Sequence, residues 1–205
     1  MNNDEKTEKI KSWLGTGSIN IFGIQFSGKD TVGKRLADVL DAEFISSGDV
    51  VRANAEQLNN AEAQDRGLLS PTTKYSELIR EFLLSKKQTK KPLVLCSFGR
   101  WVGEEASVIE ATNQSGHPIK AVIVLKISEQ EVFSRWRKSF EIGDRPGRVD
   151  ESEDGLRTRL AEFYAKTIPV IEAYRDMGLL VEINGEQSRD AVFVEVIDKL
   201  FKFIG

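Results

Sequence analysis

The sequence predicts an α/β fold: a doubly wound, five-stranded parallel sheet in three layers, with helices on both faces. Two features of the 205 residues indicate this class. Short apolar runs alternate with longer segments of helical periodicity, as in chains built from successive strand–helix units. The runs at 92–96 and 119–127 are continuous and not alternating, which is typical of strands buried on both faces of a parallel sheet.

The strands are expected at the short apolar runs of the chain. The first run leads into a glycine-bearing turn and a helical pattern with Val32, Leu36 and Leu40 on one face. The last run is followed by an amphipathic helix over 193–204. The five predicted strands are 19–22, 44–45, 92–96, 119–127 and 179–183.

The N-terminal segment, residues 1–18, is expected to be an extension that carries one short helix. Ile10, Trp13 and Leu14 recur there at helical spacing, so the helix should pack on the body of the protein. Residues 75–83 follow the same spacing most closely in the middle of the chain.

A long helical stretch is expected over 156–174. It contains Pro169, which removes one backbone donor and is expected to kink the helix. A loop over 139–150, with two glycines and a proline, precedes it.

Composition limits the classes of function. The chain has 29 Lys+Arg against 32 Asp+Glu, and this acidic balance argues against a nucleic-acid binder or a basic membrane-surface binder. One cysteine and one histidine exclude an intramolecular disulfide and a multi-histidine metal site. We expect Cys96 to be a buried apolar side chain and His117 to lie at the surface in a loop.

The expected setting is a single-domain, cytoplasmic monomer. No apolar run approaches the roughly 20 residues that span a bilayer. The first residues are too charged for a signal peptide, and a single cysteine fits a reducing compartment.

A phosphate-binding loop is predicted directly after the first strand. Residues 23–31 read G-I-Q-F-S-G-K-D-T and match G-x-x-x-x-G-K, with Asp30 where serine or threonine usually stands. Glycines let backbone N–H groups turn toward phosphate oxygens, and the helix that follows adds its N-terminal partial positive charge. We expect the phosphates of a nucleotide, which the resemblance described below implies to be ATP, to be bound by Gly23, Ser27, Gly28, Lys29, Asp30 and Thr31. The chain has no N-K-x-D motif, which argues against a GTPase.

Further segments, in order along the chain, resemble motifs of the adenylate kinase family of nucleoside monophosphate kinases. The phosphate loop resembles G-x-P-G-x-G-K-G-T, in which threonine also stands two places after lysine. The resemblance covers roughly nine-tenths of the chain, from about residue 19 onward. The other segments are 46–52 for S-T-G-D-x-L-R, 67–71 for G-x-L-V-P, 98–100 for F-P-R, 147–151 for G-R-x-D-D and 157–169 for R-K-R-L…Y…P.

This resemblance implies phosphoryl transfer from ATP to a nucleoside monophosphate, with AMP favoured and Mg²⁺ as cofactor. It also implies one kinase domain over 1–205, with a monophosphate-binding segment at 46–75 and a short lid at 139–150. The lid contains no cysteine, so we expect no zinc. Neither a nucleic acid nor a membrane is expected as a partner.

The resemblance assigns roles to cationic residues at the motif positions. Arginine suits phosphate because its planar fork stays charged and binds phosphate bidentately. Lys29, Arg100, Arg148 and Arg159 are the expected catalytic residues, and Arg135 and Gln187 are placed with ATP. The acceptor monophosphate is assigned to Ser47, Gly48, Arg52, Arg100, Glu104 and Glu105.

Two departures from the family pattern concern the metal and the acceptor base. Cys96 stands where the family has an aspartate that holds water on Mg²⁺, so we expect Asp30 to take over part of the anchoring; the alternative is that Asp30 caps the helix and points outward. Glu104, or Glu105 with a one-residue insertion, stands where the family reads AMP with glutamine. A carboxylate only accepts hydrogen bonds, which fits an amino group or the N1–H and amino pair of guanine.

Two alternatives to an adenylate kinase stay open. The glutamate at 104 or 105 favours a kinase for another monophosphate, such as CMP, UMP or GMP. The replacement by Cys96, with Ser139 where a further lid arginine is expected, would fit a nucleotide-binding protein that has lost catalysis.

Overall fold

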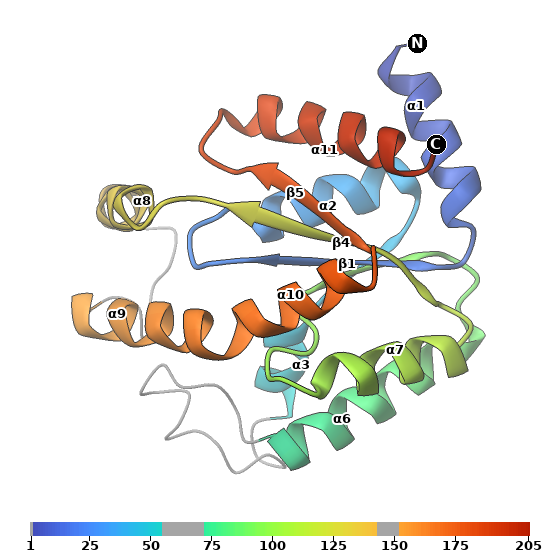
Figure 1. Cartoon of the computed structure of the whole chain (residues 1–205), viewed down its shortest axis with the longest axis horizontal. Helices are drawn as coiled ribbons and strands as arrows, with labels where there is room; N and C mark the ends of the chain where they lie inside the picture. Colours follow the sequence, from blue (N-terminus) through green and yellow to red (C-terminus); the bar gives the residue numbers. More distant parts are fainter. Residues whose placement is uncertain (1, 55–71, 143–151) are drawn as a thin grey trace.

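The computed structural model describes residues 2–54, 72–142 and 152–205, and its centre is a parallel sheet of five strands in the order β2-β3-β1-β4-β5 (Figure 1). Every strand lies within one residue of its predicted position at each end. Among the described residues no helix is both long and apolar enough to cross a membrane. The strands are β1 (Ser18–Gly23), β2 (Glu43–Ser46), β3 (Leu93–Cys96), β4 (Ile119–Lys126) and β5 (Leu180–Asn184).

The order of the strands determines where a ligand can bind at the edge of the sheet. β1 pairs with β3 on one side and with β4 on the other, although neither is its neighbour in sequence. Ile21 lies opposite Cys96, so β1 and β3 end at the same edge of the sheet. Ligands of open α/β sheets bind at such a point, outside the carboxyl ends of the strands.

Helices cover both faces of the sheet, which confirms the predicted three layers. One face carries α1 (Asn3–Leu14), α2 (Lys29–Leu40) and α11 (Arg189–Phe203) (Figure 1). The opposite face carries α3 (Ser47–Ala53), α6 (Thr72–Ser85), α7 (Glu104–Gln114) and α10 (Ile168–Asp176) (Figure 1). α8 (Glu129–Ile142) and α9 (Glu153–Glu162) lie toward the carboxyl ends of the strands.

Two hydrophobic cores lie between these layers, one on each face of the sheet. Successive residues of β4 belong to opposite cores, with Val122 and Val124 in one and Ile123 and Leu125 in the other. Because side chains alternate across a strand, an uninterrupted apolar run is what a sheet buried on both faces requires.

The N-terminal helix forms as predicted and belongs to one of these cores. Ile10 and Leu14 of α1 are fully buried, and Trp13 meets Phe203 of α11 edge-on. The N-terminus of α1 is closed by a capping box in which Asn2 and Glu5 exchange hydrogen bonds.

The predicted kink before Pro169 takes the form of a π-helical turn. Phe163–Thr167 (η3) joins α9 to α10 with the wider π spacing, and Pro169 lies in the first turn of α10. Proline has no N–H to donate, so the ladder of α-helical hydrogen bonds cannot continue through it.

Two expectations about loops were wrong. The loop predicted to begin at residue 139 starts later, because α8 continues to Ile142. Trp136 and Phe140, one turn apart, pack edge-on with ring centroids 5.1 Å apart and extend the helix. The rest of the predicted lid, from 143, lies outside the described residues.

His117 is not a surface residue: its exposed fraction is 1%. Its Nδ1 lies 2.6 Å from the carbonyl oxygen of Thr16, and its Nε2 lies 3.2 Å from that of Lys86. The imidazole therefore connects the segments around residues 16, 86 and 117 at the amino edge of the sheet. Its two partners are distant in sequence, so no local pattern around residue 117 indicates burial.

Candidate active site

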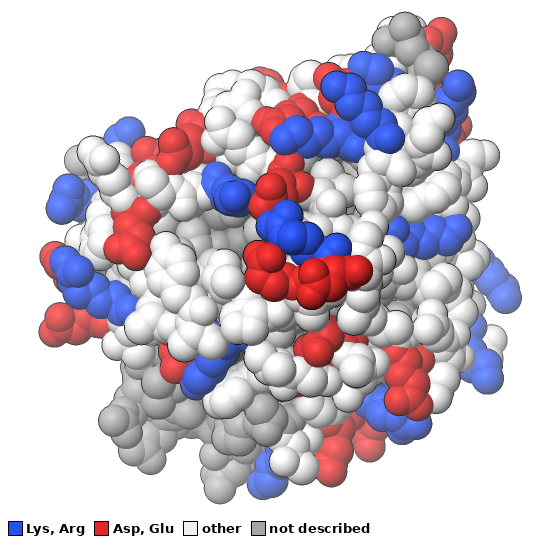
Figure 2. All heavy atoms as spheres, viewed as in Figure 1, with Lys and Arg blue, Asp and Glu red and all other residues white. Residues whose placement is uncertain are grey.

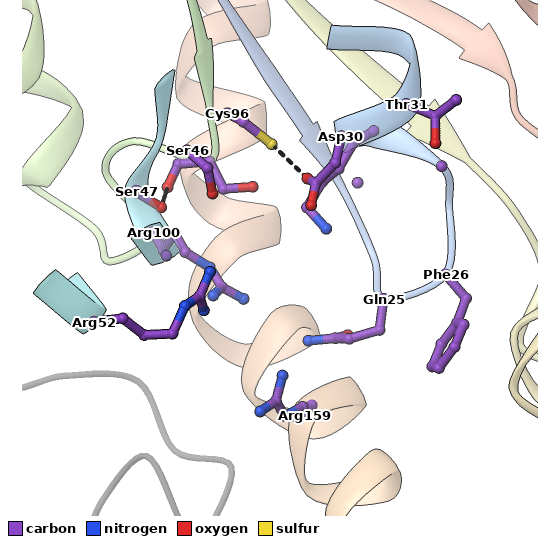
Figure 3. A pocket seen from close by; sticks show the side chains of 15 residues that line it. Gln25, Phe26, Asp30, Thr31, Ser46, Ser47, Arg52, Cys96, Arg100 and Arg159 are labelled. Atoms are coloured by element: carbon purple, nitrogen blue, oxygen red, sulfur yellow. Dashed lines mark hydrogen bonds between the residues drawn. The ribbon is translucent and has the colours of Figure 1, made fainter. Parts of the chain in front are cut away.

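The phosphate loop and three neighbouring elements enclose a cavity of about 150 Å³ at the carboxyl edge of β1 and β3 (Figure 3). The loop and the start of α2 form one side. The beginning of α3, the β3–α7 loop and α9 supply the others. Segments far apart in sequence thus meet at the carboxyl edge of the sheet, where the strand order predicts a ligand site.

The phosphate loop has the backbone geometry that its glycines permit. A Cβ on Gly23 would lie 2.4 Å from Oγ of Ser27, so the loop closes over a position that only glycine can occupy. Gly28 has a φ of +87° and leads directly into α2 at Lys29. Phe26 stands where the family motif has its second glycine, yet keeps a left-handed φ of +63°. A bulky residue in that region is strained, as is frequent at functional sites.

Four predicted cationic residues line this one cavity. Figure 3 shows Arg52 from α3, Arg100 from the β3–α7 loop and Arg159 from α9 pointing toward the same space, and Lys29 lines it from the start of α2. Burial lowers the pKa of Arg100, and the like charge of Arg159 lowers it further. Basic and acidic side chains are interspersed over the face in Figure 2, whereas here cations converge. An anion between them would offset their repulsion.

Arg52 is held at the rim of the cavity. Its guanidinium pairs with Asp49 one turn earlier on α3, and it covers Gly48, where a Cβ would lie 3.1 Å from Nη1. A side chain at residue 48 would displace the guanidinium. Ser47 donates from Oγ to the carbonyl oxygen of Ser97 at 2.7 Å, which connects α3 to the loop that carries Arg100.

Asp30 points into the cavity and not outward. Its Oδ1 accepts a hydrogen bond from Sγ of Cys96 at 3.1 Å, so the two residues that depart from the family pattern touch each other. Burial raises the pKa of the Cys96 thiol to about 12, which keeps it protonated as a donor and excludes it as a nucleophile. Thr31, one residue further along α2, is exposed at the mouth.

The residues present fit Mg²⁺ carried by a nucleotide. The described part of the chain contains no cluster of three or more His, Cys, Asp or Glu that would form a cage. Mg²⁺ in phosphate-transfer sites uses one or two carboxylates together with substrate phosphates. Asp30 is the carboxylate that lines this cavity.

A second cavity of about 420 Å³ adjoins the other side of the phosphate loop. It contains Arg135, Gln187 and apolar surface from Val192 and Phe193, and its volume suits a nucleoside. Arg135 lies between the loops, donating to the carbonyl oxygens of Phe26 at 3.1 Å and Gly185 at 2.7 Å. The predicted ATP residues divide between the two cavities: Ser27, Arg135 and Gln187 line the second, Gly23, Lys29 and Asp30 line the first, and Gly28 and Thr31 line both.

Glu104 and Glu105 begin α7, beside the cavity. Glu104 is only 4% exposed, and its Oε2 accepts from the backbone N–H groups of Arg100 and Trp101. Glu105 accepts from the N–H of Gly103 at 2.7 Å. Trp101 packs outside the cavity, with Nζ of Lys166 3.8 Å from its ring centroid.

Sequence reasoning missed the residues that shape the Arg100 loop. Asn20, fully buried in β1, exchanges hydrogen bonds with both backbone groups of Phe98. Thr167 donates from η3 to the carbonyl oxygen of Arg100. Asn20 was detectable in principle, because it is the one amide side chain within the otherwise apolar core of a predicted buried strand. Arg148 and the turn at 67–71 lie outside the described residues.

Fold and site together define a phosphate-loop protein in which a polyphosphate cavity adjoins a nucleoside-sized cavity. A sequence model described as adenylate kinase matches residues 21–179. The chain is 28% identical to the adenylate kinase of Phocaeicola vulgatus over 185 residues, which cover 88% of this chain and 96% of that protein. It is 30% identical to the adenylate kinase of Leifsonia xyli over 177 residues, covering 84% and 87%.

The similarity extends beyond bacteria. Human adenylate kinase isoenzyme 1 is 28% identical over 200 residues, which cover 94% of this chain and 97% of the human protein. The chain belongs to the adenylate kinase family, and it is a nucleotide-binding phosphotransferase of the nucleoside monophosphate kinase type.

Proposed function

We propose that the protein transfers a phosphoryl group reversibly between ATP and AMP, with Mg²⁺. The observation that carries this proposal is the convergence of Lys29, Arg52, Arg100 and Arg159 on one cavity beside the phosphate loop. Two anionic nucleotides meet only where cations offset their repulsion. A protein that positions and neutralises both supplies most of what phosphoryl transfer requires.

The cationic residues divide between donor and acceptor. Lys29 holds the donor phosphates with the backbone N–H groups of residues 23–31, and Arg135 and Gln187 lie on the nucleoside side of ATP. Ser47, Gly48, Arg52 and Arg100 form the acceptor side. Arg159 is assigned to the transferring group from its place in the cavity, and Arg148 is assigned to it from its motif position alone. No general base is required, because the attacking phosphate oxygen is already ionised at neutral pH.

Asp30 is the residue that we assign to Mg²⁺. Its carboxylate lies within the phosphate cavity, where a cation would separate it from phosphate oxygens of like charge. When bound, Mg²⁺ neutralises charge on the donor phosphates. The thiol of Cys96 orients the carboxylate through its hydrogen bond.

A second acceptor is favoured by one observation. The position that reads adenine through glutamine in the family carries the carboxylate of Glu104, and Glu105 follows it. A group that only accepts hydrogen bonds suits cytosine or guanine as well as adenine. The second candidate is therefore a kinase for CMP or GMP built on the same site.

An acceptor panel tests the proposal. The purified protein is supplied with ATP and Mg²⁺ against AMP, CMP, UMP, GMP and dTMP, and the diphosphate products are measured. We expect the highest kcat/KM with AMP. Preference for CMP or GMP would favour the second candidate, and ATP binding without transfer to any acceptor would contradict both.

We also propose that the enzyme works as a cytoplasmic monomer. Lys29, Arg52, Arg100 and Arg159 all come from one chain, so the cavity needs no residue from a second copy. Sedimentation of the active enzyme tests the oligomeric state, and fractionation of cells tests the location.

A further inference from the structure

The loop from β3 to α7 carries Arg100, and side chains from four other elements hold its backbone. At its inner end, Oγ of Ser47 donates to the carbonyl oxygen of Ser97 at 2.7 Å. Nδ2 of Asn20 donates to the carbonyl oxygen of Phe98 at 2.8 Å, and Oδ1 accepts from its N–H at 3.3 Å. Ser97 itself has a left-handed φ of +58°, so this part of the loop is held in an unusual conformation.

The backbone of Arg100 is held by hydrogen bonds to both its N–H and its carbonyl group. Oε2 of Glu104 accepts from the N–H of Arg100 at 2.8 Å and from that of Trp101 at 3.1 Å. On the other side, Oγ1 of Thr167 donates to the carbonyl oxygen of Arg100 at 3.3 Å. Both Glu104 and Thr167 are almost fully buried. Hydrogen bonds that a carboxylate accepts from backbone N–H groups are charge-assisted and therefore stronger than neutral ones.

The side chain of Glu104 is turned away from the phosphate cavity, which it does not line. It lies between α6 and α7, in a small space that it shares with Tyr75, Ile79 and Val108. A carboxylate suits two N–H groups because it offers only acceptors, whereas the amide of glutamine offers one acceptor and one donor.

Gly99 links this arrangement to a second departure from the family motif. Its φ is +73°, whereas the proline of F-P-R fixes φ near about −65°. A Cβ on Gly99 would lie 3.2 Å from Cγ2 of Val108 and 3.3 Å from the backbone carbon of Glu104. The loop therefore follows a path that a proline cannot take, tight against the first turn of α7, and this path brings the N–H of Arg100 to the carboxylate.

We infer that Glu104 is a positioning residue for phosphoryl transfer: its carboxylate fixes the peptide of Arg100 so that the guanidinium enters the cavity, and it does not read the acceptor base. This inference rests on the proposed role of Arg100 toward the acceptor phosphate. It reassigns the residue that position alone would make the base reader.

The test compares two substitutions at one site across all acceptors. Glu104→Gln keeps an oxygen that accepts both N–H bonds, while Glu104→Leu removes it at similar volume. We expect Glu104→Leu to lower kcat/KM about 10²-fold by one common factor for every acceptor, since small misplacements in such sites cost that much. Glu104→Gln should stay within about threefold of the unsubstituted enzyme. The order of acceptor preference should change in neither variant.

Backbone hydrogen exchange gives a readout that does not depend on activity. We expect the amides of Arg100 and Trp101 to exchange about tenfold faster or more in Glu104→Leu, and to stay protected in Glu104→Gln. Glu110→Leu, the same change at an exposed position of α7, is the matched control and should alter neither kinetics nor exchange. Thr167→Val removes the hydrogen bond to the carbonyl oxygen of Arg100 and leaves Glu104 unchanged. It should lower kcat/KM by one common factor for every acceptor, as Glu104→Leu does.

The outcomes separate the inference from the proposed function. A changed order of acceptors in either Glu104 variant would make Glu104 a base reader and overturn the inference. So would full activity of Glu104→Leu with the exchange of both amides unchanged. Absence of transfer by the unsubstituted enzyme with every acceptor would instead contradict the proposed function.

Discussion

At the scale of single residues, the main feature of the cavity is that cationic side chains lie close together in it. Arg100 and Arg159 lie close enough for the like charge of one to lower the pKa of the other, and burial lowers the pKa of Arg100 as well. A bound anion would offset the repulsion between these two arginines. The phosphate loop, which lines the same cavity, is the part of the site that binds such an anion. These arginines should therefore stabilise the transition state most strongly, because the negative charge is then shared by both nucleotides.

Arg159 is expected to act mainly on turnover. Replacement of Arg159 by alanine should lower kcat about 10³-fold, because arginines that touch the transferring group act chiefly in the transition state. The KM for ATP should change little, since Lys29 and the loop backbone remain. Steady-state kinetics with varied ATP measures both values. Arg137→Ala, at an exposed position of α8, is the control, and a fall in kcat of less than about tenfold in Arg159→Ala would remove the assignment.

A carboxylate at position 96 should be able to replace the one at position 30 as the metal anchor. Asp30→Gly is expected to raise the Mg²⁺ concentration for half-maximal rate about tenfold, because it removes the carboxylate that lines the phosphate cavity. Adding Cys96→Asp to that variant restores a carboxylate across the 3.1 Å contact and should recover most of the loss. Rates over a Mg²⁺ titration measure this. If Asp30→Gly leaves the titration curve in place, the metal assignment is wrong.

Glu104 should make stability depend on pH. Burial raises its pKa from 4.5 to about 7, so the folded protein binds this proton more tightly than the unfolded chain does. The stability it contributes is complete below pH 4.5 and is lost as the pH rises through about 7. Ionisation then costs the folded state on the order of 3 kcal/mol.

Glu104→Gln removes this dependence. Between pH 4.5 and 8 the unsubstituted protein should lose on the order of 3 kcal/mol of unfolding free energy relative to the variant. Urea unfolding at several pH values measures the difference. Parallel pH profiles for the two proteins would show that Glu104 ionises normally.

The residues that line the site could be predicted from the sequence more reliably than the directions in which their side chains point. Lys29, Arg52, Arg100 and Arg159 follow from motif positions, and all of them line the cavity. Asp30 was left between two orientations, because spacing along a helix does not show that a thiol from β3 lies across from it. Glu104 was assigned to the base by position, while its bonds depend on a loop path that Gly99 permits.

At the scale of elements, the π-helical turn η3 sets the relation between α9 and α10. Arg159 lies before it and Thr167 at its end, so the turn determines whether both face the Arg100 loop. The wider turn holds one residue more than an α-helical turn would. One residue corresponds to a rotation of about 100° around a helix, which is enough to carry a side chain to another face.

Deletion of Ala165, an exposed residue of η3, should convert the turn to regular α-helix. α9 would rotate and Arg159 would leave the cavity, so kcat should fall by on the order of 10² while ATP binding and circular dichroism change little. Calorimetry and steady-state assays measure these quantities. Ala165→Ser keeps the chain length and should behave as the unsubstituted protein. Normal kcat after the deletion would show that the π turn has no part in aligning Arg159.

Elements were predictable where they depend on local pattern. The five strands are short, mainly apolar runs set between helical patterns, and this combination of length and composition is typical of strands in a covered parallel sheet. The end of α8 depends on an aromatic contact between Trp136 and Phe140, and the burial of His117 depends on carbonyl groups near residues 16 and 86. Contacts of that kind are made by tertiary structure, so periodicity does not reveal them.

At the scale of the whole molecule, the phosphate cavity and the N-terminal helix α1 lie at separate places in the fold. The cavity is at the carboxyl edge of the sheet, where β1, α3 and α9 meet, whereas α1 packs beside α11 in the core on the other face (Figure 1). Stability and catalysis should therefore respond to different substitutions. Changes in α1 should alter the folding equilibrium and leave the geometry of the arginines intact.

Leu14→Ala tests this separation. Leu14 is fully buried in the core between α1, α2 and α11, so its truncation should lower the unfolding free energy by about 3 kcal/mol through lost burial and an unfilled cavity. The kcat below the unfolding transition should stay within about twofold, because the substitution lies far from the phosphate loop. Val194→Ala, on α11 at 40% exposure, is the matched control and should cost less than about 1 kcal/mol. Urea unfolding and kinetics are measured on the same samples. Equal costs for the two substitutions would show that α1 is not part of the core, and a large fall in kcat would show that α1 is coupled to the site.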